Sequence, residues 1–304
     1  MTERSSSEIL SRLRDERIIK NAIVRHMVKQ CARNFFCAQG FIEVDTPILG
    51  DPLDEYTASH FTVQGRGSLY SLPQSPQLYK QLIVMRSLER YFQFPHCFRD
   101  EEFDPRRTDQ APEFMQIDFE LRTDDAAEVR SITESFMATL CAELNVLCQT
   151  PFPVIDAVEC VAAYGTDKPD LKGSSDGNVF LWVVNFPLVE ASVDGKFTPA
   201  HHPFALPVLP EGTVLPAPLD GIRTHSYDLV LNGMEIGGGD LRIHSKELQE
   251  EIIRLFGLDS KQFTLLLEAM SDGSVYPHGG MGIGFDRLVM QLTRTKNIRD
   301  VNFF

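Results

Sequence analysis

The segment SYDLVLNGMEIGGG, residues 226–239, constrains the fold more than any other part of the chain. An Asn-Gly pair between two apolar runs is typical of a two-residue turn, so the sequence predicts an antiparallel hairpin around Asn232 and Gly233. This turn places Asp228 and Glu235 on one face as diagonal neighbours. Such neighbours lie about 7–8 Å apart, so two carboxylates there can bind one hard cation such as Mg²⁺. Three glycines follow, and they weaken a strand unless something must approach its backbone closely.

The other patterns predict helices and hairpins in one domain. Apolar spacing predicts a helix over 8–39 with one break, a helix with Ser75 as N-cap and Pro76 as first residue, and helices over 124–148, 245–256 and 260–271. Strands are predicted in 41–49, in a hairpin over 60–73, twice within 91–121, over 180–191, and in GGMGIG before a last helix, with proline-rich loops before 178 and over 203–221. Because the strands come mostly as hairpins, the sequence predicts a single α+β domain over 1–304 with a largely antiparallel sheet.

Charge and composition exclude several classes of function. The net charge is −14, with only small basic groupings, which disfavours strong independent binding of nucleic acid. No apolar run reaches the roughly 18 residues that a membrane span needs, and the N-terminus lacks the apolar core of a signal peptide, so we expect a cytoplasmic protein. The six cysteines form no CxxC pair and are expected to be buried thiols.

Polar residues alternate along the segment EFMQIDFEL. If it is a strand, Phe114, Gln116, Asp118 and Glu120 share one face, and the apolar residues between them take the other. Such a segment is either a surface strand or the wall of a site.

Three more segments carry candidate site residues. Gln77 and Lys80 face the same way at a helix start, a place suited to an anion, and Arg287 leads the last helix in GIGFDRL, which is not a Walker loop. His201 and His202 are adjacent in an extended segment and so point opposite ways; a joint metal site is therefore not expected, although one of them can border a pocket. Taken singly, each segment is also compatible with a solvated surface.

These segments occur in an order that resembles the catalytic core of class II aminoacyl-tRNA synthetases, and within them the bacterial-type aspartyl branch. FIEVDTPIL is similar to the first motif of the family, FRDEEFDPRRTDQAPEFMQIDFE to the second, and GMGIGFDRL to the third. QSPQLYKQL, YGTDKPDL, HHPFALP and YDLVLNGMEIGGGDLRIH are similar to segments of the aspartyl branch. The resemblance covers nearly the whole chain and implies an antiparallel sheet flanked by helices, and a homodimer formed through the first helix and the Pro47 strand.

The resemblance also implies site roles in the activation of aspartate with ATP and Mg²⁺. Arg99 would contact the α-phosphate and the acyl carboxylate, Glu101 the adenine amino group, Phe114 the adenine ring and Arg287 the γ-phosphate, while Asp228 and Glu235 would bind magnesium. The amino acid would be bound by Lys80 and Arg242 at its side chain, with Asp118 and Gln77 orienting them, by Glu55, Ser75 and Gln116 at its α-amino group, and beside His201 and His202.

Four departures from the family pattern bear on this expectation. The chain begins just before the first motif, without the anticodon-binding barrel, and KGSSDGNV stands where the bacterial branch has an inserted domain. LDEYTASHF replaces the loop that closes over the amino acid, keeping only Glu55. Asp240 stands where the family has serine, and a carboxylate beside Arg242 can neutralise it and weaken binding of an acidic side chain.

Three hypotheses follow. The leading one is an enzyme that activates aspartate or a close analogue as the acyl-adenylate and transfers it to ammonia, another amine or a carrier. The second is a minimal ligase that still charges tRNA. The third is a non-catalytic regulatory or binding paralogue, against which the joint presence of Arg99, Glu101, Asp228, Glu235 and Arg287 argues.

Overall fold

The protein is built around one nine-stranded sheet. The computed structural model describes residues 5–50, 60–101, 107–171, 177–190, 197–210, 215, 219, 221–271, 273 and 275–303. Within these residues the strand order is β1-β4-β6-β13-β12-β11-β8-β7, with β5 also paired to β6. The strands of this sheet are β1 (Ile42–Glu43), β4 (Arg90–Gln93), β5 (His96–Phe98), β6 (Glu113–Arg122), β7 (Val154–Asp156), β8 (Phe180–Val184), β11 (Ser226–Leu231), β12 (Met234–Leu241) and β13 (His278–Gly284). Only the β1–β4 and β7–β8 pairs are parallel, so the predicted α+β fold with a largely antiparallel sheet is confirmed.

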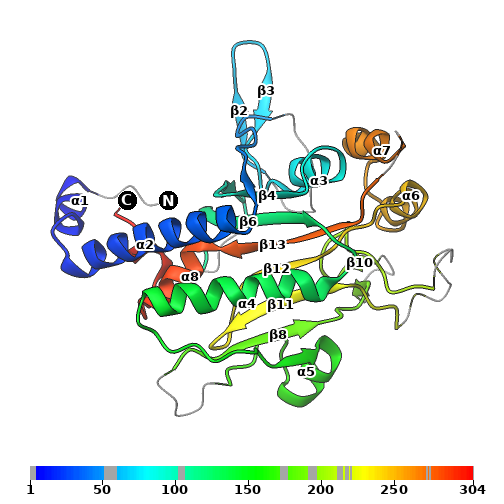
Figure 1. The fold of residues 1–304 in the computed structure, drawn as a ribbon. Helices are drawn as coiled ribbons and strands as arrows, with labels where there is room; N and C mark the ends of the chain where they lie inside the picture. Colours follow the sequence, from blue (N-terminus) through cyan, green and yellow to red (C-terminus); the bar gives the residue numbers. More distant parts are fainter. Residues whose placement is uncertain are drawn as a thin grey trace.

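The helices leave one face of the sheet largely open (Figure 1). They are α1 (Ser6–Arg12), α2 (Glu16–Ala38), α3 (Gln77–Arg86), α4 (Ala126–Glu143), α5 (Ala157–Tyr164), α6 (Lys246–Leu255), α7 (Thr264–Ser271) and α8 (Phe285–Leu292). The long helices α2 and α4 run across one face, and α8 packs into the same core. A second cluster joins α3, α6 and α7 beyond one end of the sheet. None of the helices in the described ranges is long and apolar enough to cross a membrane.

The main core explains why β6 alternates. Met115, Ile117 and Phe119 are buried on the face covered by α2 and α4. The ring of Phe119 lies 5.1 Å from that of Phe36 on α2, which in turn lies 5.5 Å from Phe136 on α4. Because successive side chains of a strand point to opposite faces, this packing turns the polar residues of β6 toward the open face.

The predicted hairpin at residues 226–239 is confirmed. Asn232 and Gly233 have φ of +49° and +79°, the left-handed values that a tight hairpin turn requires, and β11 pairs Val230 with Glu235. A bulge after Leu229 then shifts the register, so that Asp228 lies opposite Gly238. The bulge itself was not predicted, because nothing in the local pattern marks the extra residue.

Other local predictions are also confirmed. The first helix breaks after Arg12 and resumes at Glu16, and Gly40, at φ +78°, follows its end. The hairpin around 65–67 forms from β2 (Thr62–Gln64) and β3 (Leu69–Ser71), and a second small pair joins β9 (Val189–Glu190) to β10 (Thr198–Pro199). Parts of the predicted loops, including 172–176 and 211–214, lie outside the described residues.

Four sequence predictions are wrong in detail. The helix after Ser75 begins at Gln77 rather than Pro76, and Ser75 Oγ accepts from the Gln77 N–H at 3.3 Å. The segment 91–121 contains three strands, not two, because Pro95 interrupts the edge and separates β4 from β5. The proline- and glycine-rich stretch after α4 was predicted to be a loop, but it contains β7 and α5. The helix α5 has Asp156 as its N-cap and Gly165 as its C-cap. The described cysteines have free thiols, but Cys37 is exposed and Cys148 is half-buried rather than buried.

Candidate active site

A cavity of about 580 Å³ opens on the polar face of the sheet. It is bordered by β6, β11, β12, the start of α3 and the start of α8, with the segment around His201 closing one side. This volume is in the range of small-molecule sites. The cavity brings together every predicted site residue that the structure describes: Ser75, Gln77, Lys80, Arg99, Glu101, Phe114, Gln116, Asp118, His201, His202, Asp228, Glu235, Arg242 and Arg287. Glu55 lies outside the described residues.

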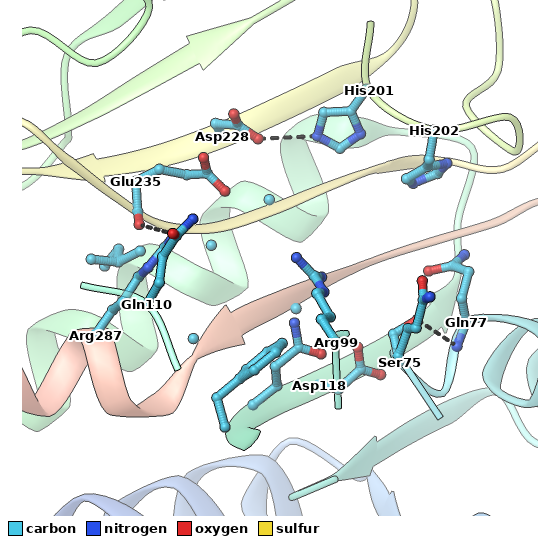
Figure 2. Close-up of a pocket in the computed structure, with 18 of the residues that line it drawn as sticks. Ser75, Gln77, Arg99, Gln110, Asp118, His201, His202, Asp228, Glu235 and Arg287 are labelled. Carbon is cyan, nitrogen blue, oxygen red and sulfur yellow. Dashed lines mark hydrogen bonds and ion pairs between the residues drawn. The ribbon is translucent and has the colours of Figure 1, made fainter. Parts of the chain in front are cut away.

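Asp228 and Glu235 lie on the same wall of the cavity, as the hairpin predicted (Figure 2). Asp228 Oδ1 is 3.0 Å from His201 Nε2, and Glu235 Oε2 is 2.8 Å from Lys168 Nζ. Gly238 lies opposite Asp228 in the hairpin, and a Cβ there would collide with Asp228 Oδ1 and lie 3.2 Å from His201 Nε2. The glycine is therefore needed because protein side chains occupy the space beside the strand.

The two carboxylates repel each other and are held by neighbouring cations. Burial, reinforced by the charge of Glu235, raises the pKa of Asp228. Burial also disfavours the charged form of Glu235, but Lys168 outweighs it and holds the pKa of Glu235 below its ordinary value. The raised pKa of Asp228 means that its charged form is disfavoured beside Glu235. A divalent cation between the two carboxylates would relieve this repulsion, so the pair suits such a cation.

Arg287 is positioned at the first turn of α8. Its Nε donates to the backbone oxygen of Asp109 at 3.2 Å, its Nη1 donates to the backbone oxygen of Glu235 at 3.1 Å, and its Nη2 lies 3.4 Å from the Asp109 carboxylate. The neighbouring Asp286 accepts from the backbone N–H of Met115 at 2.8 Å and is bonded to Arg25 of α2. These contacts fix the helix start against β6 and leave the guanidinium at the cavity wall.

Arg99 lies between Arg287 and Ser75 in the cavity (Figure 2), and Phe114 is beside it. The guanidinium carbon of Arg99 is 5.1 Å from the centroid of the Phe114 ring, within the range of a cation–π contact. Phe114 is on β6 and pairs with Cys97 of β5, whereas Arg99 follows β5 directly. Glu101 also borders the cavity.

The opposite end of the cavity begins at α3. Gln77 and Lys80 both face it, as their spacing predicted, and both are almost fully buried. Lys80 Nζ lies 2.7 Å from Asp118 Oδ2 and 3.5 Å from Glu120 Oε2. Burial raises the pKa of Asp118 to about 6 although Lys80 opposes the shift.

Arg242 sits behind this end in a buried ionic cluster. Its Nε and Nη2 donate to the two carboxylate oxygens of Glu120 at 2.8 and 3.0 Å, and its Nη1 donates to Asp240 Oδ1 at 2.6 Å. Burial disfavours the charged form of Asp240, but Arg242 and the neighbouring histidines outweigh it and hold its pKa far below the ordinary value. The sequence-based expectation that Asp240 would neutralise Arg242 agrees with this geometry.

The expectation that the two histidines point opposite ways is wrong. The chain bends at His201, and the rings of His201 and His202 lie 5.0 Å apart and both approach Asp240. Their charges differ: burial lowers the pKa of His202 to about 4, whereas burial of His201 is outweighed by its contacts with the carboxylates of Asp228 and Asp240, which raise its pKa to about 10. Ligand atoms of His201, His202 and Asp240 come within 4.8 Å of one another.

Sequence reasoning missed several residues of the site. Lys168 lies in a segment without helical or strand periodicity, and only its place in YGTDKPDL could have drawn attention to it. Asp109 lies in the charged loop before β6, where many acids are equivalent in sequence. Glu120 had a detectable signal, since it continues the polar alternation of Gln116 and Asp118, but it was given no role.

The arrangement has two chemically distinct ends. One combines Arg287 with the Asp228–Glu235 pair, with Arg99 in the middle of the cavity (Figure 2), which suits a polyphosphate together with a divalent cation. The other combines Gln77, Lys80 and Arg242 with buried acids, which suits a small polar molecule. Two anionic reactants placed end to end in such a cavity could react by positioning and electrostatic stabilisation.

Comparison with known proteins agrees with this description. Residues 2–304 match the family of class II tRNA synthetases (D, K and N). The chain is 30% identical to the aspartate–tRNA(Asp/Asn) ligase of Oleidesulfovibrio alaskensis over 423 aligned positions, which cover 96% of this chain and 69% of that protein. It is 29% identical to the aspartate–tRNA ligase of Thermosipho africanus over 424 positions, covering 96% and 71%. Because these alignments are longer than the 304-residue chain, the relatives carry additional residues between matched segments.

The fold is also found among solved structures. The asparaginyl-tRNA synthetase from Pyrococcus horikoshii complexed with asparaginyl-adenylate superimposes with a TM-score of 0.78, covering 99% of this chain and 72% of that one at 21% identity. The asparaginyl-tRNA synthetase from Entamoeba histolytica in complex with asparaginyl-adenylate gives a TM-score of 0.75, covering 100% and 71% at 20% identity. These likenesses establish the fold of the catalytic sheet.

Proposed function

We propose, from the premise that this chain belongs to the class II tRNA synthetases of the D, K and N group, that it activates L-aspartate or a close analogue as its aminoacyl-adenylate. The observation that carries the proposal is the cavity itself, where Arg99, Arg287 and the Asp228–Glu235 pair face Gln77, Lys80 and Arg242 across one continuous space. Members of the family are ligases that form aminoacyl-adenylates, and the residues assigned to that step below all border this cavity except Glu55, which lies outside the described residues.

In the proposed reaction, an oxygen of the amino-acid carboxylate attacks the α-phosphorus of ATP. The bond from that phosphorus to the α,β-bridging oxygen breaks, and pyrophosphate leaves. The step needs no protein nucleophile, since the two substrates react directly once they are held together. Arg99 is assigned to the α-phosphate and the attacking carboxylate, where negative charge accumulates, and Arg287 to the γ-phosphate.

The remaining nucleotide contacts are assigned by side-chain chemistry. Glu101 accepts a hydrogen bond from the adenine amino group, and the face of Phe114 stacks on the ring. Asp228 and Glu235 would hold Mg²⁺, which would neutralise phosphate charge. Their fit to a cation is supported by the raised pKa of Asp228, whose carboxylate is disfavoured by burial and by Glu235.

The amino-acid contacts occupy the other end. Gln77, Lys80 and Arg242 are assigned to the side chain, with Asp118 orienting Lys80 through their 2.7 Å ion pair. Ser75, Gln116 and Glu55 are assigned to the α-amino group, and His201 and His202 form the side of this pocket beside Asp240.

The test is amino-acid-dependent exchange of pyrophosphate into ATP, with Mg²⁺ and without tRNA, across aspartate, asparagine, glutamate and β-substituted aspartates. Exchange with aspartate or an analogue is expected. The variant Arg287→Lys should lower it about 100-fold, because a planar guanidinium contact is lost. Arg254→Lys, on the exposed side of α6, is the matched control and should behave as wild type. Absence of exchange with every amino acid, in protein that still binds ATP, contradicts the proposal.

We assign the acyl group to a small amine or a carrier rather than to tRNA. The support is the net charge of −14, which gives the chain no general attraction for a phosphate backbone. The purified adenylate-forming protein is incubated with amino acid and ATP plus ammonia, hydroxylamine or unfractionated tRNA. Amide or hydroxamate formation without tRNA charging is expected, and charging of tRNA would favour the alternative of a minimal tRNA ligase.

We further propose that two copies of the chain pair through α1, α2 and the β1 edge. Large apolar side chains are exposed along these elements, with exposed fractions between 38% and 56%: Leu10, Leu13, Ile19, Ile23, Ile42, Ile48 and Leu49. Exposed large apolar side chains gathered on a few elements are typical of an interface. The strand and helix are those that the family resemblance assigned to a homodimer.

A further inference from the structure

The guanidinium of Arg242 is almost completely used by the protein itself. An arginine has five N–H groups. In this structure three of them donate to carboxylate oxygens, two to Glu120 and one to Asp240, and Nη1 also lies 2.7 Å from His202 Nε2. The fork formed by Nε and Nη2 is therefore taken by Glu120, and Nη1 is taken by Asp240. A substrate carboxylate would have to compete with these two acids for Arg242.

The amino-acid end also has no excess of positive charge. Its cations are Lys80, Arg242 and His201, the last held between the carboxylates of Asp228 and Asp240. Its nearby anions are Asp118, Glu120, Asp240 and Asp228, all with exposed fractions of 6% or less. An acidic substrate side chain would therefore add a fifth buried negative charge beside three cations, which is costly in a site of low polarity.

Four polar atoms of this end are buried without a hydrogen-bond partner among the described residues. Two of them, His201 Nδ1 and Asp240 Oδ2, face each other at 3.5 Å, and the other two are Asp118 Oδ1 and Gln77 Nε2. Asp118 and Gln77 border the cavity, Asp118 from β6 and Gln77 from the first turn of α3. Together with the remaining N–H groups of Arg242 and the ammonium of Lys80, they offer donors to one oxygen and an acceptor to one N–H group.

We propose that the amino-acid end of the cavity accepts an uncharged carboxamide side chain, as in asparagine or an N-substituted β-amide of aspartate, in preference to the free carboxylate of aspartate. The carbonyl oxygen accepts from Lys80 and Arg242, and the amide N–H donates to Asp118 Oδ1. Asp240 is the specificity-determining residue, because it occupies the Arg242 N–H that an acidic side chain would need. The inference rests on the adenylate formation proposed above and names its substrate class.

The first experiment compares kcat/KM for pyrophosphate exchange with asparagine and with aspartate in the wild-type protein. We expect asparagine to be preferred by about 100-fold, the scale of an uncompensated buried charge. The variant Asp240→Ser frees the Nη1 group of Arg242 and removes one negative charge, so the preference should reverse toward aspartate. Asp124→Ser removes the same charge from an exposed position and should leave the preference unchanged.

Binding of stable adenylate analogues keeps the test independent of turnover and of the variant's folding. The 5′-O-sulfamoyl adenosines of asparagine and aspartate are titrated into the wild-type protein by calorimetry, and the asparaginyl compound should bind about 100-fold more tightly. Equal or tighter binding of the aspartyl compound overturns the inference, even where exchange is active. Absence of exchange with all amino acids, combined with selective binding of the asparaginyl compound, instead contradicts the proposed catalysis and leaves the pocket assignment standing.

Discussion

At the residue scale, the site is a chain of carboxylates that each have a protein cation. Asp118 has Lys80, Glu120 and Asp240 have Arg242, Asp228 has His201, and Glu235 has Lys168. A buried charge without such a partner costs several kcal/mol. A ligand cation can therefore bind one of these carboxylates only by taking the place of its protein cation. Lys168 is the partner with the most exposed side chain in this series, at 39%, and it is the one that a divalent cation can most readily replace.

Replacing Lys168 by Met should tighten the binding of a divalent cation to the nucleotide-free protein by about tenfold. The variant removes the charge that holds the pKa of Glu235 low, so Asp228 and Glu235 repel each other more strongly and gain more from a cation. Mn²⁺ binding followed by electron paramagnetic resonance measures the change. Lys246→Met, on the surface of α6, is the control. Unchanged or weaker Mn²⁺ binding would mean that Asp228 and Glu235 do not share a cation.

At the element scale, the β11–β12 hairpin is the part that the sequence specified most completely. The Asn-Gly turn, the pairing of Val230 with Glu235 and the common face of the two acids all followed from local pattern, because a two-residue turn fixes the register. The polar face of β6 and the helix start at Gln77 followed in the same way. These are the features whose causes lie within a few residues of each other.

The rest of the site depended on contacts between distant segments. The break between β4 and β5 follows from Pro95, but the pairing of both strands with β6 does not. The approach of His202 to Asp240 brings together residues 38 positions apart, and Lys168 reaches Glu235 across 67. Contacts between residues so far apart in the chain produce no local pattern in the sequence, so only the resemblance to a family could have indicated them.

A substitution at Gly238 tests the role of the β11–β12 hairpin in positioning Asp228. In Gly238→Ala the added Cβ would collide with Asp228 Oδ1 and crowd His201, so either the carboxylate or the strand must move. We expect a loss of about 1–3 kcal/mol in the free energy of unfolding, and a larger proportional loss of pyrophosphate exchange because Asp228 is displaced. Urea unfolding and exchange kinetics measure the two effects. Gly50→Ala, whose Cβ would meet only the Tyr79 hydroxyl at 3.4 Å among the described residues, is the control; a variant of Gly238 with wild-type exchange would exclude a role for Asp228 at that position.

At the scale of the whole molecule, the exposed apolar side chains of α1, α2 and the β1 edge are a surface that one chain does not cover. Ile23→Asp should convert the protein from dimer to monomer, because a charge at a 56% exposed isoleucine is tolerated in water but not in an apolar interface. Sedimentation velocity measures the change. Leu265→Asp places the same charge on α7, at a leucine that is 61% exposed, and should leave the mass unaltered. A wild-type protein that sediments as a monomer would remove the proposed pairing altogether.

Stability of the whole fold should depend on pH through three buried histidines. Burial lowers the pKa of His202 and of His278 to about 4, whereas unfolded histidines titrate near 6.5. Between these values the unfolded chain binds protons that the folded chain does not, so the free energy of unfolding falls as pH decreases from 6.5 toward 4. Each histidine contributes on the order of 3 kcal/mol, since one pKa unit corresponds to about 1.4 kcal/mol. Asp118, whose pKa burial raises to about 6, binds a proton in the folded state below that pH and offsets part of the loss.

His201 has the opposite effect on the free energy of unfolding, which it lowers at alkaline pH. Burial opposes its charge, but Asp228 and Asp240 raise its pKa to about 10, so the folded chain retains a proton that the unfolded chain releases above pH 6.5. Stability is therefore lost as pH rises from 6.5 to 10, and the free energy of unfolding should be greatest near pH 6.5. Urea unfolding from pH 4.5 to 9.5 measures both limbs, and His278→Gln, which changes a residue outside the cavity, should flatten only the acid limb. Nuclear magnetic resonance of labelled histidines in the wild-type protein gives the same answer without a variant: a His201 that loses its proton below pH 8, or a His202 that gains one above pH 6, would contradict the assigned charges of the amino-acid end.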